Sequence, residues 1–324
     1  MPPVAEGRQP SPFFVDDIVA KSEVIVVGQV GAAADVGPGT AVFPGRGPKP
    51  LEGRILSAEV KVSHWIKGAA KSRVLRLHYI RFDRLVAPTP GYRELLCVLF
   101  LRAVGDHYEL VDVTRPNVPA AEATPEGDSP LERVASAVAG VVSPGAIRSW
   151  LTLGTLSALG GISTESARRA LTSMMRSPDR FLQLDAVGRL ALRGDRVALE
   201  FATDALERPG SLSTVEAGML RNHVANGWLP EDAYPMIRRL LRSKRVENRL
   251  AAVRALGNGS SPAAIPLLAE ALSDRDADVR WHSMVQLAGI AGTTVRVAGN
   301  GSPKQQEAEE RYWKNWVSER GLGR

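Results

Sequence analysis

The segment from residue 249 to residue 288 carries the same pattern twice. Arg249 is followed by Leu-Ala-Ala-Val-Arg-Ala-Leu-Gly, and Arg280, 31 positions later, is followed by Trp-His-Ser-Met-Val-Gln-Leu-Ala. A period of this length is typical of a repeat made of two helices. One such repeat cannot bury its apolar face alone. We therefore expect stacked copies that share a continuous core and leave an extended surface open for a partner.

The chain beyond residue 130 is expected to be helical throughout. Its segments carry apolar residues at three- and four-residue spacing, which is the period of a helix with one buried face. Leu184, Val187 and Leu190 show the same apolar spacing 66 positions before the first copy, about two repeats away. The predicted helices cover residues 131–142, 146–159, 164–176, 180–192, 196–207, 214–226, 231–242, 247–256, 263–272, 278–291 and 305–320.

Residues at the helix ends support this interpretation. Ser163, Asp195 and Ser213 lie where the side chain of an N-cap residue is expected to accept a hydrogen bond from the first turn. The last segment places Trp313 and Trp316 on one side of a helix. An array of repeats needs a terminal element that covers its last member, so we expect this segment to be a capping helix.

The first third of the chain has the signals of β-strands. Short segments rich in Val, Ile, Leu and aromatic residues cover residues 23–30, 54–66, 73–80, 93–103 and 107–113. In the second segment apolar and polar residues alternate from Leu56 to Lys67, which is the pattern of a strand with one buried face. The stretch 31–53 is rich in glycine and proline, so we expect it to be a mobile loop between the first two strands.

A change of composition near residue 119 predicts a domain boundary. Residues 119–130 are turn formers with little to bury. We therefore expect an α+β, multidomain fold. It consists of a small five-stranded β-barrel over residues 1–118, a linker over 119–130, and an α-solenoid of helical repeats with its capping helix over 131–324.

Two resemblances refine this expectation. The run from Val15 to Val30, the segment Val60-Lys-Val-Ser-His-Trp-Ile-Lys-Gly68 and the glycine-led strand over 91–101 resemble the netrin/tissue-inhibitor-of-metalloproteinase-like (netrin/TIMP-like) module. That resemblance implies a five-stranded OB-type barrel. The inhibitors of that family bind zinc through an amino-terminal cysteine held by disulfides. This chain begins Met-Pro-Pro and has only Cys97, so inhibition is not implied.

The stretch from Ala263 to Arg280 resembles a HEAT repeat. It has the acidic turn Asp274-Arg-Asp-Ala-Asp278, followed by the Val-Arg pair that this family places at the start of its second helix. The resemblance implies HEAT-like helical repeats over the C-terminal two thirds of the chain. HEAT families are mostly solenoids that bind proteins, although a few members act as enzymes on nucleic acid or on a bilin chromophore.

Charge, cysteine content and hydropathy limit the remaining possibilities. The formal net charge of +6 is spread evenly along the chain, which disfavours a dedicated nucleic-acid-binding arm. One cysteine excludes an internal disulfide. No stretch approaches the roughly 20 apolar residues of a membrane-spanning helix, so we expect a soluble chain. The resemblance of the barrel to the netrin/TIMP-like module favours export. Residues 1–12 lack the basic-then-apolar order of a signal peptide, so we expect the leader of an exported protein to be absent from this sequence.

No catalytic, cofactor-binding or metal-binding residues can be assigned from the sequence. The five histidines never stand at a ligand spacing such as i and i+4, and each is interpreted as an isolated surface or packing residue. Cys97 lies inside an apolar run, which is typical of a core residue. We therefore predict no cofactor and no enzymatic activity.

The densest positive charge is the candidate partner-binding site. It consists of Arg238, Arg239, Arg242, Lys244 and Arg245, a cluster able to bind carboxylates or phosphates. An alternative is that these arginines only stabilise the C-terminal end of their helix, whose dipole favours positive charge. Arg249 and Arg280 are interpreted differently, because HEAT proteins use arginine there to connect neighbouring turns.

The function predicted from these features is a non-enzymatic scaffold or adaptor that binds a protein partner. Because the arginine cluster is positively charged, we expect that partner to be acidic. Two alternatives stay open. One is a HEAT-like enzyme of the lyase or DNA-repair type. The other is a nucleic-acid binder that uses the 238–249 arginine cluster together with Lys61, Trp65 and Lys67 of the barrel. Bases stack on an aromatic side chain between cations, which is the reason to consider it, but this alternative is disfavoured.

Overall fold

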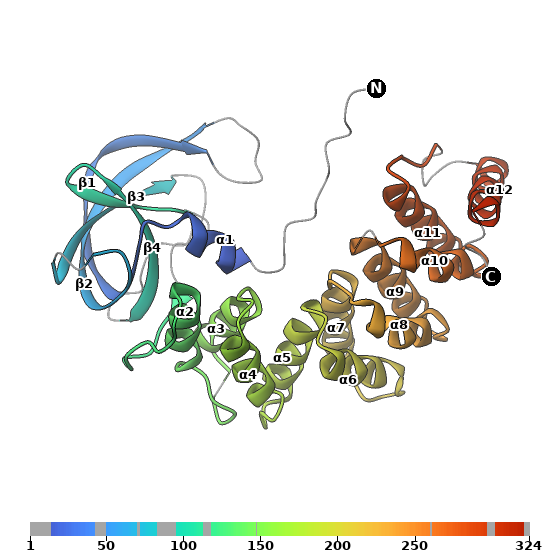
Figure 1. The fold of residues 1–324 in the computed structure, drawn as a ribbon, viewed down its shortest axis with the longest axis horizontal. Helices are drawn as coiled ribbons and strands as arrows, with labels where there is room; N and C mark the ends of the chain where they lie inside the picture. The colour runs from blue at the N-terminus through green and yellow to red at the C-terminus, as the bar shows by residue number, and fades with distance from the viewer. Residues whose placement is uncertain are drawn as a thin grey trace. The chain divides into compact units, whose positions relative to one another are not determined.

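The structure is a computed structural model that describes residues 14–42, 50–69, 72–82, 95–112, 118–146, 148–259, 261–296 and 302–320. It has the expected α+β layout, with a sheet followed by helices (Figure 1). The chain divides into two compact units. The first unit is Phe13–Leu182, and the second is built on Gln183–Arg324.

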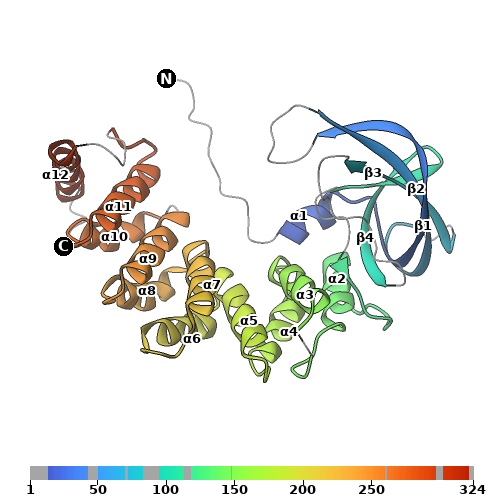
Figure 2. The ribbon, with the colours of Figure 1, turned by 180° about the vertical axis from the view of Figure 1, so that it is seen from behind.

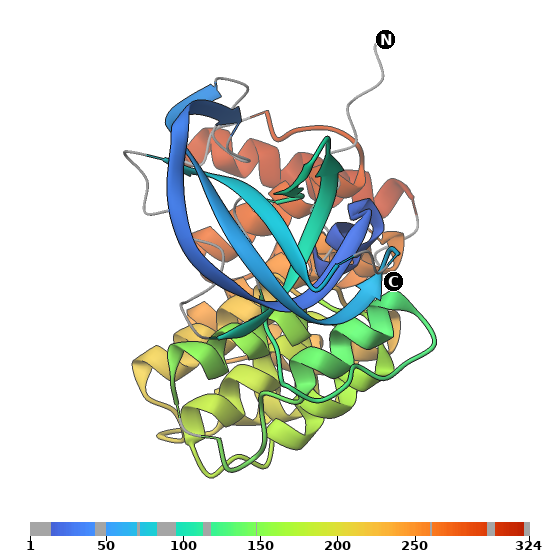
Figure 3. The ribbon, with the colours of Figure 1, turned by 90° about the vertical axis from the view of Figure 1, so that its left-hand side faces the viewer.

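The sheet of the first unit closes on itself. Its strands are β1 (Val24–Val42), β2 (Pro50–Lys67), β3 (Val74–Phe82), β4 (Leu96–Val104), β5 (His107–Leu110) and the two-residue β6 (Val118–Pro119). They follow the order β1-β2-β3-β5-β4-β6, and β1 also pairs with β4, which completes a barrel (Figure 3). The β3–β5 pair is parallel, whereas the other pairs are antiparallel.

The predicted alternation in β2 is confirmed by burial. Leu56, Ala58, Val60 and Val62 are buried, whereas the residues between them are exposed or half-buried. They pack against side chains from the other strands, and Cys97 belongs to the same cluster. A strand whose side chains point to opposite faces therefore supplies one face of the barrel core.

The loop predicted over residues 31–53 is wrong for the described residues 31–42 and 50–53. There β1 and β2 continue as a paired hairpin as far as Val42 and Pro50. The register shifts between Val30 and Ala33 and again between Asp35 and Gly37. Such bulges place the extra residues outside the ladder, so a sequence rich in glycine can still pair. Residues 43–49 of the predicted loop lie outside the described residues.

A short helix, α1 (Phe14–Lys21), precedes the barrel. Val15, Ile18 and Val19 are buried on one side of it. The ammonium group of Lys67, at the end of β2, donates a hydrogen bond of 3.0 Å to the carbonyl oxygen of Val19. This bond satisfies one of the carbonyl groups that a helix leaves free at its C-terminal end.

The first unit also contains the helices α2 (Pro130–Ala139), α3 (Trp150–Gly160) and α4 (Glu165–Met174). Helix α2 lies against β2 and β4 (Figure 2). The segment before it is hydrogen-bonded at its start, where the amide of Ala120 donates to the carbonyl oxygen of Leu96 and that of Ala121 to the carbonyl oxygen of Ala137. The division between the two compact units falls inside α5, between Leu182 and Gln183. The domain bounds 1–118 and 131–324 stay a prediction.

The second unit repeats at the predicted period. Its helices are α5 (Arg180–Leu192, which crosses the division), α6 (Arg196–Glu207), α7 (Thr214–Ala225), α8 (Tyr234–Leu241), α9 (Val246–Asn258), α10 (Ile265–Ala271), α11 (Ala277–Ile290) and α12 (Pro303–Glu319). Short 3-10 turns, Glu231–Ala233 and Pro262–Ala264, lead into α8 and α10. The pairs α8/α10 and α9/α11 each begin 31 residues apart.

These helices form two layers. Helix α7 packs on α9 and α9 on α11, while α6 packs on α8, and the view in Figure 1 shows α10 next along the α6–α8 side. The side chains of Asp195 and Ser213 accept hydrogen bonds from the first turns of α6 and α7, as predicted. The cap of α4 is Thr164 instead of the predicted Ser163, and the Thr164 side chain accepts from the amide of Ala167. The backbone amide of Ser163 donates to Asp16 of α1.

Arg249 and Arg280 occupy equivalent places and connect neighbouring turns. The guanidinium group of Arg249 donates to both carboxylate oxygens of Asp274, at 2.8 and 3.0 Å, and to the carbonyl oxygen of Ser243. That of Arg280 donates to Glu310 of α12 and to the carbonyl oxygen of Asp274. Each arginine thus binds a carbonyl six positions back and a carboxylate from the next element.

Helix α12 contacts α10 and α11 at the end of the second unit. Trp313 is 1% exposed, and its indole N–H donates a hydrogen bond of 2.9 Å to Glu309. Glu309 is itself buried and also accepts from the backbone amide of Arg296. Trp316 is half-buried, with the guanidinium group of Arg320 over its ring.

Candidate protein-binding surface

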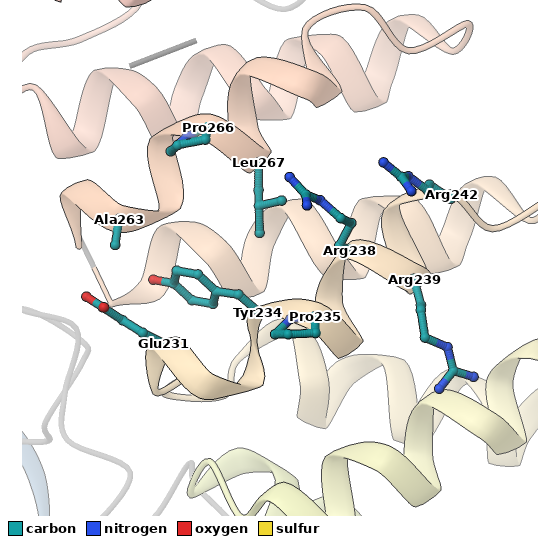
Figure 4. Close-up of a pocket in the computed structure, with 9 residues that line it drawn as sticks. All are labelled: Glu231, Tyr234, Pro235, Arg238, Arg239, Arg242, Ala263, Pro266 and Leu267. Carbon is teal, nitrogen blue, oxygen red and sulfur yellow. The ribbon is translucent and has the colours of Figure 1, made fainter. Parts of the chain in front are cut away.

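Helices α8 and α10 border a pocket of about 590 Å³ in the second unit. The two helices begin 31 residues apart, and each has a proline at its second position, so the pocket lies between equivalent surfaces of successive repeats. Proline is favoured in a first turn, where its missing N–H is not needed. The lining residues, drawn in Figure 4, are Glu231, Tyr234, Pro235, Arg238, Arg239, Arg242, Ala263, Pro266 and Leu267.

Two arginines of the predicted cluster converge on one carboxylate. The Nε atom of Arg242 lies 2.9 Å from Oε1 of Glu270, and Nε of Arg238 lies 3.3 Å from Oε2 of the same group. Arg238 and Arg242 are one helical turn apart on α8, so their side chains leave the helix on the same face. All three side chains are at least a third exposed to solvent.

Arg239 belongs to a different contact. In Figure 4 its side chain points away from those of Arg238 and Arg242. Its Nη2 atom donates a hydrogen bond of 2.7 Å to Asp204 of α6. Successive residues of a helix are rotated by about 100°, so the neighbour of Arg238 must face another direction.

The other two predicted residues lie in the turn between α8 and α9. The guanidinium group of Arg245 is half-buried and donates to the carbonyl oxygen of Leu206. The Lys244 side chain is exposed, and its carbonyl oxygen accepts from Arg249 and Arg275. Arg238, Arg239 and Arg242 all line the pocket, but Arg239 pairs with another carboxylate than the other two. The side chains of Lys244 and Arg245 lie outside the pocket lining.

The rest of the pocket is largely apolar. Pro235, Pro266 and Leu267 supply aliphatic surface, and Tyr234 contributes its ring. Burial raises the pKa of Tyr234, which keeps its hydroxyl protonated as a hydrogen-bond donor. Glu231 lines the same pocket, and its carboxylate accepts a hydrogen bond of 3.4 Å from the Ser261 hydroxyl.

Glu270 and the apolar lining were not among the predicted site residues. Glu270 follows the arginines by 28 to 32 positions and is a single acidic residue in an apolar helix, so nothing local to it indicates its partners. A signal for the pocket did exist, because Pro235 and Pro266 are separated by the same 31 residues as Arg249 and Arg280. Equivalent positions of stacked repeats lie next to each other.

The chemistry available here is recognition. An arginine pair can bind a carboxylate in defined geometry, and the apolar lining can take up a side chain. Within the described part of the chain, no group of three or more His, Cys, Asp or Glu residues is placed to hold a metal ion. No helix in those ranges is long and apolar enough to cross a membrane.

The residues proposed for stacking a base are engaged with the barrel. Trp65 is half-buried and packs against the barrel core, while Lys67 donates to the end of α1. Lys61 is exposed. A ring in contact with the core offers less surface to a base than a free one, so the three side chains do not form an open platform.

The histidines are less isolated than the sequence suggested. His78 and His107 stack with their ring centroids 3.9 Å apart. His223 of α7 donates from Nδ1 to the carbonyl oxygen of Met219, and its Nε2 lies 3.9 Å from Asp185. Burial, together with the charge of the Arg189 guanidinium, lowers the pKa of His223.

Comparison with known proteins adds a family likeness to this geometry. Residues 224–294 match the family model of HEAT repeats, which covers α8 to α11 and the pocket between them. No curated protein matches the chain significantly. Among solved structures the chain is similar to an engineered protein, with 19% identity and a TM-score of 0.32. The match covers 61% of this chain and 62% of that one, and it carries no further argument.

Proposed function

We propose that the protein is a non-enzymatic scaffold that binds an acidic segment of a protein partner through the surface of its second unit. The observation that carries this proposal is the arginine pair, Arg238 and Arg242, at an apolar pocket between two repeats. HEAT repeats commonly serve as protein-interaction scaffolds, and residues 224–294 match that family. Recognition sites combine apolar lining with a few placed polar groups, which is the composition found here.

The N-terminal barrel is proposed to be an OB-type module of netrin/TIMP-like kind. Its strand order, in which β1 pairs with both β2 and β4, supports this proposal. We propose no inhibitory role for it, because its cysteine, Cys97, is buried in the barrel core and is not placed to bind a metal ion of a protease. Its resemblance to that family is also the basis for proposing export.

The test is a capture experiment with an extract of the native host, treated with nuclease to remove bridging nucleic acid. The bait is the full chain, compared with the variants Arg238→Gln, Arg242→Gln and Lys244→Gln. Lys244 is exposed and lies outside the pocket lining, so its variant controls for the loss of one positive charge.

A scaffold of the proposed kind retains a protein whose amount is reduced by Arg238→Gln and Arg242→Gln but not by Lys244→Gln. A protein retained equally by all four baits binds elsewhere and contradicts the proposed surface. Retention of nucleic acid before nuclease treatment, with an affinity that falls steeply as salt rises, would favour the nucleic-acid alternative. Turnover of a retained small molecule would favour an enzyme.

A further inference from the structure

We infer that Glu270 occupies the place of the partner's carboxylate and competes with it for Arg238 and Arg242. This inference rests on the proposed function and goes further, because it assigns a self-masking role to a residue of the site. It also defines the partner segment as an acidic residue beside a bulky apolar one, such as phenylalanine.

The first argument is the geometry of the contact. Each Glu270 oxygen faces one guanidinium group, Oε1 at Arg242 and Oε2 at Arg238. A guanidinium group has five N–H donors, so one carboxylate shared by two arginines uses only part of their capacity. The contact is also exposed, at 36% for Glu270 and 66% for Arg242, so water screens it and the cost of exchanging one carboxylate for another is small.

The second argument is the local charge. Two arginines share one glutamate, which leaves one positive charge at this end of the pocket. Arg239 adds nothing to it, because it pairs with Asp204 of α6. A partner carboxylate can therefore join the arginines or replace Glu270, and in both cases the native glutamate opposes it by like-charge repulsion.

The third argument concerns the rest of the partner segment. The apolar lining of Tyr234, Pro235 and Leu267 lies beside the arginine pair in a pocket of about 590 Å³, which is large enough for one bulky side chain. Glu231 lines the same pocket and disfavours a second negative group there. A peptide with one acidic residue next to one apolar residue matches this lining, whereas the phosphate chain of a nucleic acid does not.

The test is a fluorescence-anisotropy titration with a fluorescein-labelled peptide that contains one glutamate next to one phenylalanine in a Gly–Ser background. Control peptides carry glutamine instead of the glutamate, or serine instead of the phenylalanine. The full chain is compared with Glu270→Gln, Arg238→Gln and Arg242→Gln, and with Lys244→Gln as the control for lost positive charge outside the pocket lining. Glu247→Gln is the matched control for lost negative charge, because Glu247 is an exposed residue of α9 outside the pocket lining.

The expected results have opposite signs. Glu270→Gln tightens the peptide's affinity by about twofold to fivefold, and Arg238→Gln or Arg242→Gln weakens it by about as much, the range for half-exposed charge pairs. Lys244→Gln and Glu247→Gln leave it unchanged, and both control peptides bind more weakly than the parent.

Unchanged or weaker affinity in Glu270→Gln overturns the competition between carboxylates. If the arginine variants still lose binding in that case, the proposed scaffold function stands and only this inference fails. If the native chain binds the parent peptide no better than its glutamine control, the assigned partner chemistry is wrong, and the capture experiment then decides separately on the scaffold.

Discussion

Replacing Arg249 by methionine removes a buried cation from the first turn of α9. The Arg249 side chain is 5% exposed and that of Asp274 is 11% exposed, and two short hydrogen bonds join them. Methionine keeps much of the aliphatic length of arginine but none of its donors. After the change the Asp274 carboxylate keeps the backbone amide of Asp276 but loses its countercharge.

The size of the effect follows from this burial. Removing one partner of a buried ion pair costs about 3–5 kcal/mol, because the remaining charge has neither water nor a countercharge. The carbonyl oxygen of Ser243 loses its donor as well. A domain's free energy of unfolding is about 5–15 kcal/mol, so the change removes a large part of the stability.

The measurement is urea unfolding followed by circular dichroism at 222 nm. Arg280→Met is the matched control, because Arg280 holds the equivalent position but its pair with Glu310 is more exposed, at 25% and 16%. We expect the Arg249 variant to lose clearly more stability than the Arg280 variant. In the double variant Arg249→Met/Asp274→Asn, about 1–3 kcal/mol of the loss should be recovered, since no unpaired charge remains.

The reasoning is refuted if Arg249→Met costs less than about 1 kcal/mol, the range of an exposed pair. It is also refuted if the two arginine variants are equally destabilised, because burial is then not the source of the cost. A double variant less stable than Arg249→Met would show that the stranded carboxylate is not the cause.

Three further predictions concern the packing and the histidines. Gly188→Ala should destabilise the chain by about 1–3 kcal/mol in thermal melts, because a methyl group there would lie 2.6 Å from the His223 ring. Gly218→Ala is the control: open space surrounds this glycine, so the change should be neutral or stabilising. Burial lowers the pKa of His78, His223 and His282, so the unfolded chain takes up more protons. Stability should be complete above pH 7 and fall as the pH drops below about 6.5, the ordinary histidine value; equal urea midpoints at pH 8 and pH 5 would contradict this. Trp313→Phe should lower the free energy of unfolding by about 1–3 kcal/mol, because the buried Glu309 loses the indole donor. In the same urea titration Trp316→Phe, at a half-buried position, should lower it less.

The helices could be predicted because their signals are local. The helices 180–192 and 196–207 have the predicted bounds, since apolar spacing and the Asp195 cap act within a few turns. The 31-residue period also appears directly in the structure, because each repeat buries the same face against its neighbour. The strand pattern of residues 56–63 is local in the same sense.

The hairpin over residues 31–53 could not be predicted from composition. Glycine and proline are typical of loops, but the pairing of β1 with β2 depends on hydrogen bonds between residues far apart in sequence. The same holds for Glu309, a charged residue that the structure buries beside Trp313.

The sequence alone determined that two-helix repeats follow a strand-rich region, and that α8 carries an arginine cluster. Only the tertiary structure decided which of those arginines act together. Asp204 reaches Arg239 from 35 positions away, and Glu270 reaches Arg242 from 28 positions away, on the two neighbouring helices. Helix periodicity gives the direction of each arginine, but only the packing of α6, α8 and α10 brings in the carboxylate that meets it.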